Sequence, residues 1–252
     1  MTRPGLKTGG AGGSAVWRPQ SVRPHRKGQR WRKVLVAAAA ILIGVPATLV
    51  LIYRYVPPPV TPLMLIRLVE GEGIDKDWTP LSRISPNAGY AVIAAEDNRF
   101  CEHRGLDFEA IEDALEEYQG GGDLRGASTI TMQTAKNLFL WPGRSWIRKA
   151  AEAHFTLFLE LLLPKKRILE LYLNVAEWGP GIYGIEAASQ AYFKKPASKL
   201  TRRQASLLAA ALPAPRDWSV NPPSSYVAER AQAITRRIGQ LGPLLDCARP
   251  QG

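Results

Sequence analysis

Residues 90–105, with the sequence YAVIAAEDNRFCEHRG, join an apolar stretch of helical spacing to a group of charged side chains. Apolar residues recur every three or four positions here and again over 107–118, which predicts helices over 90–100 and 107–118. The same period, with prolines and hydroxyl side chains at the ends, predicts further helices through 134–139, 146–163, 165–177, 186–192, 201–211 and 224–241. Stretches with the alternation of a β-strand are almost absent. The sequence therefore predicts an all-α domain, which we assign to residues 63–245.

Residues 34–53, VLVAAAAILIGVPATLVLIY, form a run of 20 residues without a charge. As a helix this run is about 30 Å long, the thickness of the hydrocarbon core of a bilayer. Pro46 lies inside it, which membrane helices tolerate. We expect an uncleaved transmembrane anchor. A cleaved signal peptide is the weaker alternative, because Val45-Pro46-Ala47 is a poor cleavage site.

The net charge of +11 is concentrated before this apolar run. Nine of the 33 Lys and Arg residues lie in residues 1–33, which contain no acid, and the remaining 24 nearly balance the 22 acidic residues. A nucleic-acid partner is therefore not expected, because phosphate binding needs cations on the folded surface. The charge also predicts that the tail stays in the cytoplasm and that the domain lies outside it. We expect a disordered basic tail over 1–33 and a stiff, proline-rich linker over 54–62.

Two cysteines, Cys101 and Cys247, are too few and too far apart to indicate a disulfide framework. We expect unpaired thiols, with a bridge between them as the alternative in an oxidising compartment.

Five blocks of sequence follow one another in a fixed order: EDNRFCEHRG at 96–105, GASTITMQ at 126–133 with Lys136-Asn137, RKAAE at 148–152, RILELYLN at 167–174, and LLAAALP at 207–213 with Asn221-Pro222. Each resembles one motif of the family 51 glycosyltransferases, the peptidoglycan transglycosylases that also occur in class A penicillin-binding proteins. The resemblance implies a lysozyme-like α-helical fold. Because the chain ends about 30 residues after the fifth block, it resembles the monofunctional biosynthetic enzymes of the family.

The resemblance implies a reaction in which lipid II disaccharide units are joined by β-1,4 linkage, with inversion and release of undecaprenyl pyrophosphate. Its partners are then lipid II, the growing glycan strand, the bacterial inner membrane and other wall-synthesis proteins. Glu96 takes the role of general base, which a poorly nucleophilic sugar hydroxyl needs. Glu152 takes the role of the second catalytic glutamate. The residues implied to contact the substrate are Asp97, Ser128, Thr129, Gln133, Lys136, Asn137, Arg144, Arg148 and Lys149.

Cations are needed at the leaving pyrophosphate because its charge grows as the bond breaks. Lys136, Arg144 and Arg148 match the family's pyrophosphate positions, with Lys149 as a weaker candidate. No cofactor is obligatory, and Glu152 is the position at which a divalent Mg or Mn ion would bind. His103 is expected to be a structural hydrogen-bonding residue.

One position departs from the family pattern, because Met132 stands where the family commonly has a glutamine. Either a substrate contact is lost there or the position is one of packing, which methionine can fill.

Two other functions remain open at this point. A lysozyme-like hydrolase or lytic transglycosylase also uses a glutamate in a cleft, but it needs no cations at a pyrophosphate. A non-catalytic scaffold of the wall-building machinery would use only the anchor and the folded domain.

Overall fold

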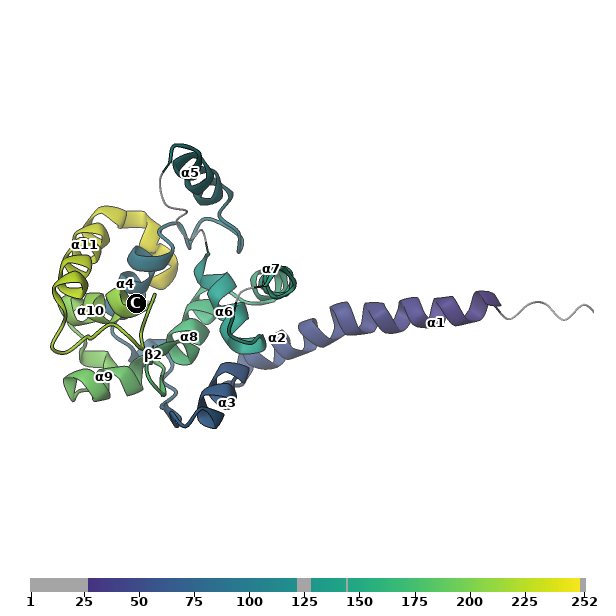
Figure 1. Cartoon of the computed structure of the whole chain (residues 1–252), viewed down its shortest axis with the longest axis horizontal. Coiled ribbons are helices and arrows are strands. Elements are labelled where there is room, and N and C mark those ends of the chain that lie inside the picture. Colours follow the sequence, from purple (N-terminus) through teal and green to yellow (C-terminus); the bar gives the residue numbers. More distant parts are fainter. Residues whose placement is uncertain (1–26, 122–127, 144, 250–252) are drawn as a thin grey trace, which may run out of the picture.

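The computed structural model describes residues 27–121, 128–143 and 145–249. Most of the predicted disordered tail, residues 1–26, lies outside them, and so does the predicted substrate residue Arg144. In the described part, a long N-terminal helix leads into a domain built almost entirely of helices (Figure 1). The all-α prediction is confirmed.

The anchor is a continuous helix made of α1 (Lys27–Ala39), a π-helical turn η1 (Ala40–Gly44) and α2 (Val45–Tyr55). Its part Trp31–Tyr55 is long and apolar enough to cross a membrane, so the helix exceeds the predicted span at both ends. It points away from the domain for most of its length (Figure 1), but Pro46 and Val50 are buried against the domain.

A hydrogen bond ties this helix to α7 (Trp146–Leu162) at the proline. Pro46 has no N–H group, so it cannot donate to the carbonyl of Leu42 four residues earlier. That carbonyl accepts from Nε2 of His154 at 2.7 Å instead. Next to this bond, Phe139 stacks on Phe155 and Tyr53 stacks on Phe139. The anchor is therefore fixed in register against the domain.

The domain contains nine α-helices among the described residues. Besides α7 they are α3 (Pro62–Val69), α4 (Pro86–Glu96), α5 (Phe108–Gln119), α6 (Ile130–Phe139), α8 (Lys165–Val175), α9 (Ile185–Phe193), α10 (Arg202–Ala211) and α11 (Ser225–Leu241). Three short 3-10 helices, η2 (Leu81–Arg83), η3 (Ala197–Lys199) and η4 (Gly242–Ala248), complete the helical elements.

Several predicted boundaries differ from the structure, most of them by one residue; the first predicted helix begins at Pro86 and not at residue 90. The first predicted helix ends at Glu96 and not at residue 100, because Asp97 leaves the helical conformation with φ of −162°. The helix α8 ends at Val175, because the chain turns into a small sheet of β1 (Asp75–Lys76), β2 (Glu177–Gly179) and β3 (Ile182–Tyr183). The sheet has the order β1-β3-β2, with β1 parallel and β2 antiparallel to β3. Strands of two or three residues are too short for an alternating pattern to indicate them.

Small side chains let the central helices approach one another closely. Helix α4 packs on α10 and α11 and buries Ala88, Ala91 and Ala94, while α10 buries Ala205 and Ala209. A side chain at Gly89 would lie 3.1 Å from Leu169 of α8. Helix α6 lies between α7 and α8. The ends of α4 and α6 thereby meet at one place, where the functional residues gather.

The expectation of unpaired cysteines is wrong. Cys101 and Cys247 form a disulfide across a sequence separation of 146 residues, with their Cα atoms 5.5 Å apart. The sequence spacing gave no indication of this pair, because α11 and η4 must first fold back onto α4 and α8 to bring the two residues together. The bridge ties the loop after Glu96 to the C-terminal helix η4.

Replacing both Cys101 and Cys247 by serine should lower the melting temperature of the full-length protein in detergent by roughly 10 °C. Closing a loop of this length stabilises a domain by about 3–5 kcal/mol through the unfolded state. Thermal unfolding, monitored by circular dichroism, compares the melting temperatures of the wild type and the double variant. A reductant should destabilise the wild type and leave the double variant unchanged; equal melting of all samples would contradict the prediction.

Candidate active site

Glu96 is the last residue of α4, and its side chain is only 12% exposed. Its Oε2 accepts a hydrogen bond of 2.9 Å from Nε2 of Gln133 on α6. The hydroxyl of Tyr172 on α8 donates to Oε1 of the same glutamine at 3.1 Å. Because Tyr172 fixes the amide in this orientation, Gln133 presents its donor and not its acceptor to the carboxylate.

Burial raises the pKa of Glu96 above its ordinary value of 4.5. The hydrogen bond from Gln133 and the charges of Arg230 and Lys136 oppose this rise, and the neighbouring Asp97 adds to it. The pKa of Lys136 is lowered, mainly by burial. Glu96 is thus a carboxylate whose pKa lies closer to neutrality than that of an exposed glutamate, as a general base requires.

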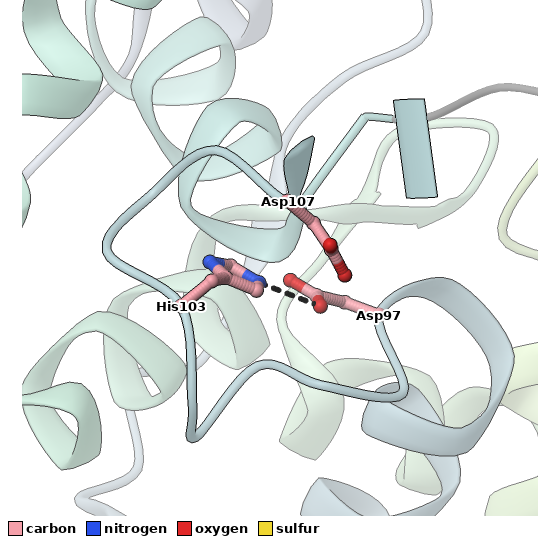
Figure 2. A group of neighbouring side chains, drawn as sticks. All are labelled: Asp97, His103 and Asp107. Atoms are coloured by element: carbon pink, nitrogen blue, oxygen red, sulfur yellow. Dashed lines mark hydrogen bonds and ion pairs between the residues drawn. The ribbon is translucent and has the colours of Figure 1, made fainter. Parts of the chain in front are cut away.

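Asp97 holds the ends of α4 and α6 together. Its Oδ2 accepts from the backbone N–H of Ile130, the first residue of α6, at 2.9 Å. Its Oδ1 lies 2.8 Å from Nε2 of His103, and Figure 2 shows this contact. The N–H of Gly105 donates to Nδ1 of His103, so the ring hydrogen sits on Nε2 and is donated to Asp97. His103 therefore acts as a structural hydrogen-bonding residue, as predicted.

The loop that carries this cluster also requires a glycine. Gly105 has φ of +88°, and a Cβ there would lie 2.6 Å from Cγ2 of Thr156 on α7. Its carbonyl accepts from the hydroxyl of Thr129, which also caps α6 by accepting from the N–H of Met132. The first two sequence blocks thus meet in one hydrogen-bonded junction.

Neither cluster of acidic side chains near the site fits a divalent metal. Asp97, His103 and Asp107 have potential ligand atoms within 4.8 Å of one another. Asp97 and His103 are engaged as described above, and Asp107 caps α5 by accepting from the N–H of Ala110. At Glu152, each oxygen already lies 2.7 Å from a cation, Nη1 of Arg148 and Nζ of Lys149. A further divalent cation would face two positive charges, so no step is assigned to a metal.

Arg148, Lys149 and Glu152 form a compact charged group on one face of α7. Glu152 and Arg148 are buried, and Lys149 also donates to the hydroxyl of Ser128 at 3.2 Å. One carboxylate thus orients two cations, which leaves an excess of positive charge. Together with Lys136, this arrangement fits an anion with several oxygens.

A cavity of about 500 Å³ joins these groups. Eight predicted residues line it: Glu96, Ser128, Gln133, Lys136, Asn137, Arg148, Lys149 and Glu152. Asp97 and Thr129 do not line it; they lie behind its wall and hold α4 and α6 in place. Met132 is buried in the domain, 5% exposed, and does not line the cavity, so this position is one of packing in this chain.

Three polar residues of the site were missed by the sequence analysis. Tyr172 lies in the fourth block but was not among the predicted site residues; it lines the cavity, and Arg67 and Glu177 line it as well. Arg67 comes from α3, directly after the anchor, and its Nε lies 3.8 Å from Oε2 of Glu177. Nothing in the local sequence indicated Arg67, because the contact depends on how α3 and β2 meet.

Comparison with known proteins agrees with this geometry. The transglycosylase family model matches residues 64–239, which include all five blocks. The chain belongs to the transglycosylase family. A relative from Caulobacter vibrioides, a biosynthetic peptidoglycan transglycosylase, is 51% identical over 218 residues, covering 86% of this chain and 95% of the relative. Proteins of the same name from Rhodospirillum centenum and Bdellovibrio bacteriovorus are 53% and 51% identical and cover 82% and 85% of this chain, and 91% and 89% of the relatives. The family resemblance predicted from the sequence is confirmed.

The Glu96 carboxyl group should titrate above the ordinary value of 4.5. Replacing Gln133 by leucine should raise the pKa of Glu96 further, because a hydrogen bond to the charged form is lost. NMR titration of protein labelled with ¹³C at the glutamate side chains measures this, and Glu96→Gln identifies the signal. A Glu96 signal that titrates at or below 4.5 would contradict the prediction.

Proposed function

We propose that this transglycosylase polymerises peptidoglycan glycan strands from lipid II, with β-1,4 linkage, inversion at the anomeric carbon and release of undecaprenyl pyrophosphate. The observation that carries the proposal is one cavity holding both a buried carboxylate and a group of cations. Glu96 provides the carboxylate, and Lys136, Arg148 and Lys149 provide the cations. The names of the relatives, biosynthetic peptidoglycan transglycosylases, agree with it.

The two groups have complementary tasks in this reaction. Glu96 accepts the proton of the attacking sugar hydroxyl, and Gln133 keeps the carboxylate in position. The three cations stabilise the charge that develops on the departing pyrophosphate, and Glu152 keeps Arg148 and Lys149 oriented before the substrate binds. Attack on the face opposite the pyrophosphate inverts the anomeric centre.

The cations also distinguish this function from its alternatives. A hydrolase or lytic transglycosylase that cuts glycan has no pyrophosphate to stabilise, so the buried Arg148 and the half-buried Lys136 would serve no purpose there. A scaffold without catalysis would have no reason to bury Glu96 and raise its pKa.

Helix α7 supports action on a lipid-linked substrate, because its two faces differ. One face carries Arg148 and Glu152 toward the cavity. The opposite face carries a stripe of side chains at helical spacing: Ile147, Ala150, His154, Leu157 and Leu161. Ile147 and Leu161 are 78% and 77% exposed, and the neighbouring Trp146 is 90% exposed. Such a helix suits the surface of a membrane, with its apolar side in the lipid.

The anchor indicates the depth of this stripe. Figure 1 shows α7 nearly end-on beside the anchor, at the side of the domain from which the anchor leaves. His154 binds the carbonyl of Leu42, 11 residues before Tyr53, which corresponds to about 16 Å along a helix. If the apolar run 34–53 fills the hydrocarbon core, the stripe enters the outer leaflet. The cavity lies on the other face of α7, so it is placed close to the bilayer that holds a lipid-linked substrate.

We infer that the chain is a single-pass protein of the bacterial inner membrane. The basic tail is cytoplasmic and the domain extracytoplasmic. The disulfide between Cys101 and Cys247 agrees with an oxidising compartment for the domain.

Glu96→Gln should reduce polymer formation from lipid II by at least about 10³-fold, because the amide cannot accept the hydroxyl proton. Full-length protein in detergent and labelled lipid II provide the assay, with separation of glycan strands by length. Glu102→Gln is the matched control, since Glu102 is exposed in the same block and pairs with Arg99. Shortening of preformed glycan by the wild type would favour the hydrolase. If neither the wild type nor Glu96→Gln acts on lipid II or on preformed glycan, the function as a non-catalytic scaffold would be favoured.

Ile147→Ser combined with Leu161→Ser should slow polymerisation of lipid II held in vesicles by about tenfold and leave the rate with a soluble short-chain analogue unchanged. Each apolar side chain contributes about 1.5–3 kcal/mol to membrane binding when it enters the bilayer. Only the reaction with the membrane-bound substrate depends on this insertion of α7. Phe108→Ser, at a 73% exposed position on α5, is the control. Equal slowing on both substrates would argue against membrane seating of α7.

A further inference from the structure

The second oxygen of the Glu96 carboxylate is buried without a hydrogen-bond partner. Oε2 accepts from Gln133, whereas no described residue donates to Oε1. Since Tyr172 holds Gln133 in place, Oε2 stays occupied. Oε1 is therefore the oxygen available to take a proton, although in the empty enzyme it has no contact with solvent.

Arg230 is the cation that faces Oε1. It lies on α11, which packs against α4, and its Nη2 is 3.7 Å from Oε1, beyond hydrogen-bond distance. The side chain of Arg230 is 31% exposed, and the described residues give it no hydrogen bond. It is thus held near the carboxylate by a long ion pair alone, and its guanidinium can move into water at little cost.

We propose that Arg230 covers Oε1 of Glu96 in the empty enzyme and yields this oxygen to the hydroxyl of a sugar bound in the cavity, so that transfer to sugar is favoured over transfer to water. Arg230 is then a positioning residue, and the inference rests on the proposed function. In the transfer step, the sugar O–H proton passes to Oε1 and the sugar oxygen bonds to the anomeric carbon. The bond from that carbon to the pyrophosphate breaks, and its electron pair leaves on the pyrophosphate.

A water molecule in place of the sugar would complete the same step and release a hydrolysed disaccharide. Arg230 does not itself line the cavity, whereas Glu96 does. A muropeptide makes many contacts along the cavity, and part of that binding energy can draw Oε1 of Glu96 away from Arg230 and toward the sugar hydroxyl. A single water has no such contacts. The cover therefore discriminates between two nucleophiles whose hydroxyl groups are chemically similar.

Other groups around Glu96 remain when Arg230 is removed. Gln133 and Lys136 face it from α6, Tyr172 from α8, and Asp97 follows it in the chain. Lys136 still favours the ionised carboxylate, so a variant without Arg230 keeps a working base. Because one nearby cation is lost, the pKa of Glu96 should rise and activity should fall off at a higher pH.

The test uses Arg230→Met in the full-length protein, with lipid II in detergent, and quantifies polymer and hydrolysed disaccharide-peptide. Arg236→Met is the control, because Arg236 is exposed on the same helix and forms no ion pair with Glu96 among the described contacts. We expect the ratio of hydrolysis to polymerisation to rise by about tenfold in Arg230→Met. The acidic limb of kcat/KM should move up by about one pH unit. Neither should change in Arg236→Met, and Arg230→Lys should restore both in part.

An unchanged product ratio and an unmoved acidic limb in Arg230→Met would overturn the proposal. Should that variant unfold, as judged by circular dichroism, the product ratio and the acidic limb are measured for Arg230→Gln instead, and the same outcomes apply. A wild type that forms no polymer from lipid II would instead overturn the proposed function, and the inference with it. The wild-type arm therefore separates the two failures.

Discussion

The hydrogen bond from the N–H of Ile130 to the carboxylate of Asp97 determines how the active site is assembled. Asp97 follows the end of α4, and Ile130 begins α6. A buried carboxylate at a helix N-terminus is stabilised both by the free N–H groups and by the helix dipole. This contact places Glu96 opposite Gln133 and Lys136. Without it, only the hydrogen bonds from Gln133 to Glu96 and from Thr129 to Gly105 would hold α6 against this segment.

Helix α7 links this site to the N-terminal apolar helix. Its inner face gives Arg148, Lys149 and Glu152 to the cavity, and its outer stripe lies beside the anchor. Pro46 has no N–H group to donate to the carbonyl of Leu42, and a buried carbonyl without a donor is costly. His154 satisfies it and so fixes the domain against the anchor. The proline in the apolar run thus contributes to the orientation of the enzyme.

Polymerisation and hydrolysis differ only in which hydroxyl group reaches the base. In this chain one oxygen of Glu96 is occupied by Gln133, and the other is covered on the side of Arg230. The disulfide between Cys101 and Cys247 holds the loop after Glu96 onto η4, which itself packs on α4 and α11. The elements around Glu96 are therefore tied together by this bridge and by the packing of η4.

The sequence alone determined the helices, the anchor, the family and eight of the residues that line the cavity. Helical period, caps and an uninterrupted apolar run depend on neighbours three or four positions apart, so they are visible without a fold. The motif residues were assigned by resemblance, which does not separate substrate contact from support. Only the tertiary structure showed that Asp97 and Thr129 lie behind the cavity wall, that Tyr172 and Arg67 line it, and that Arg230 faces Glu96. It also decided the pairing of the cysteines. Each of these contacts joins segments far apart in the chain, and their proximity depends on how the helices pack, which local sequence patterns do not record.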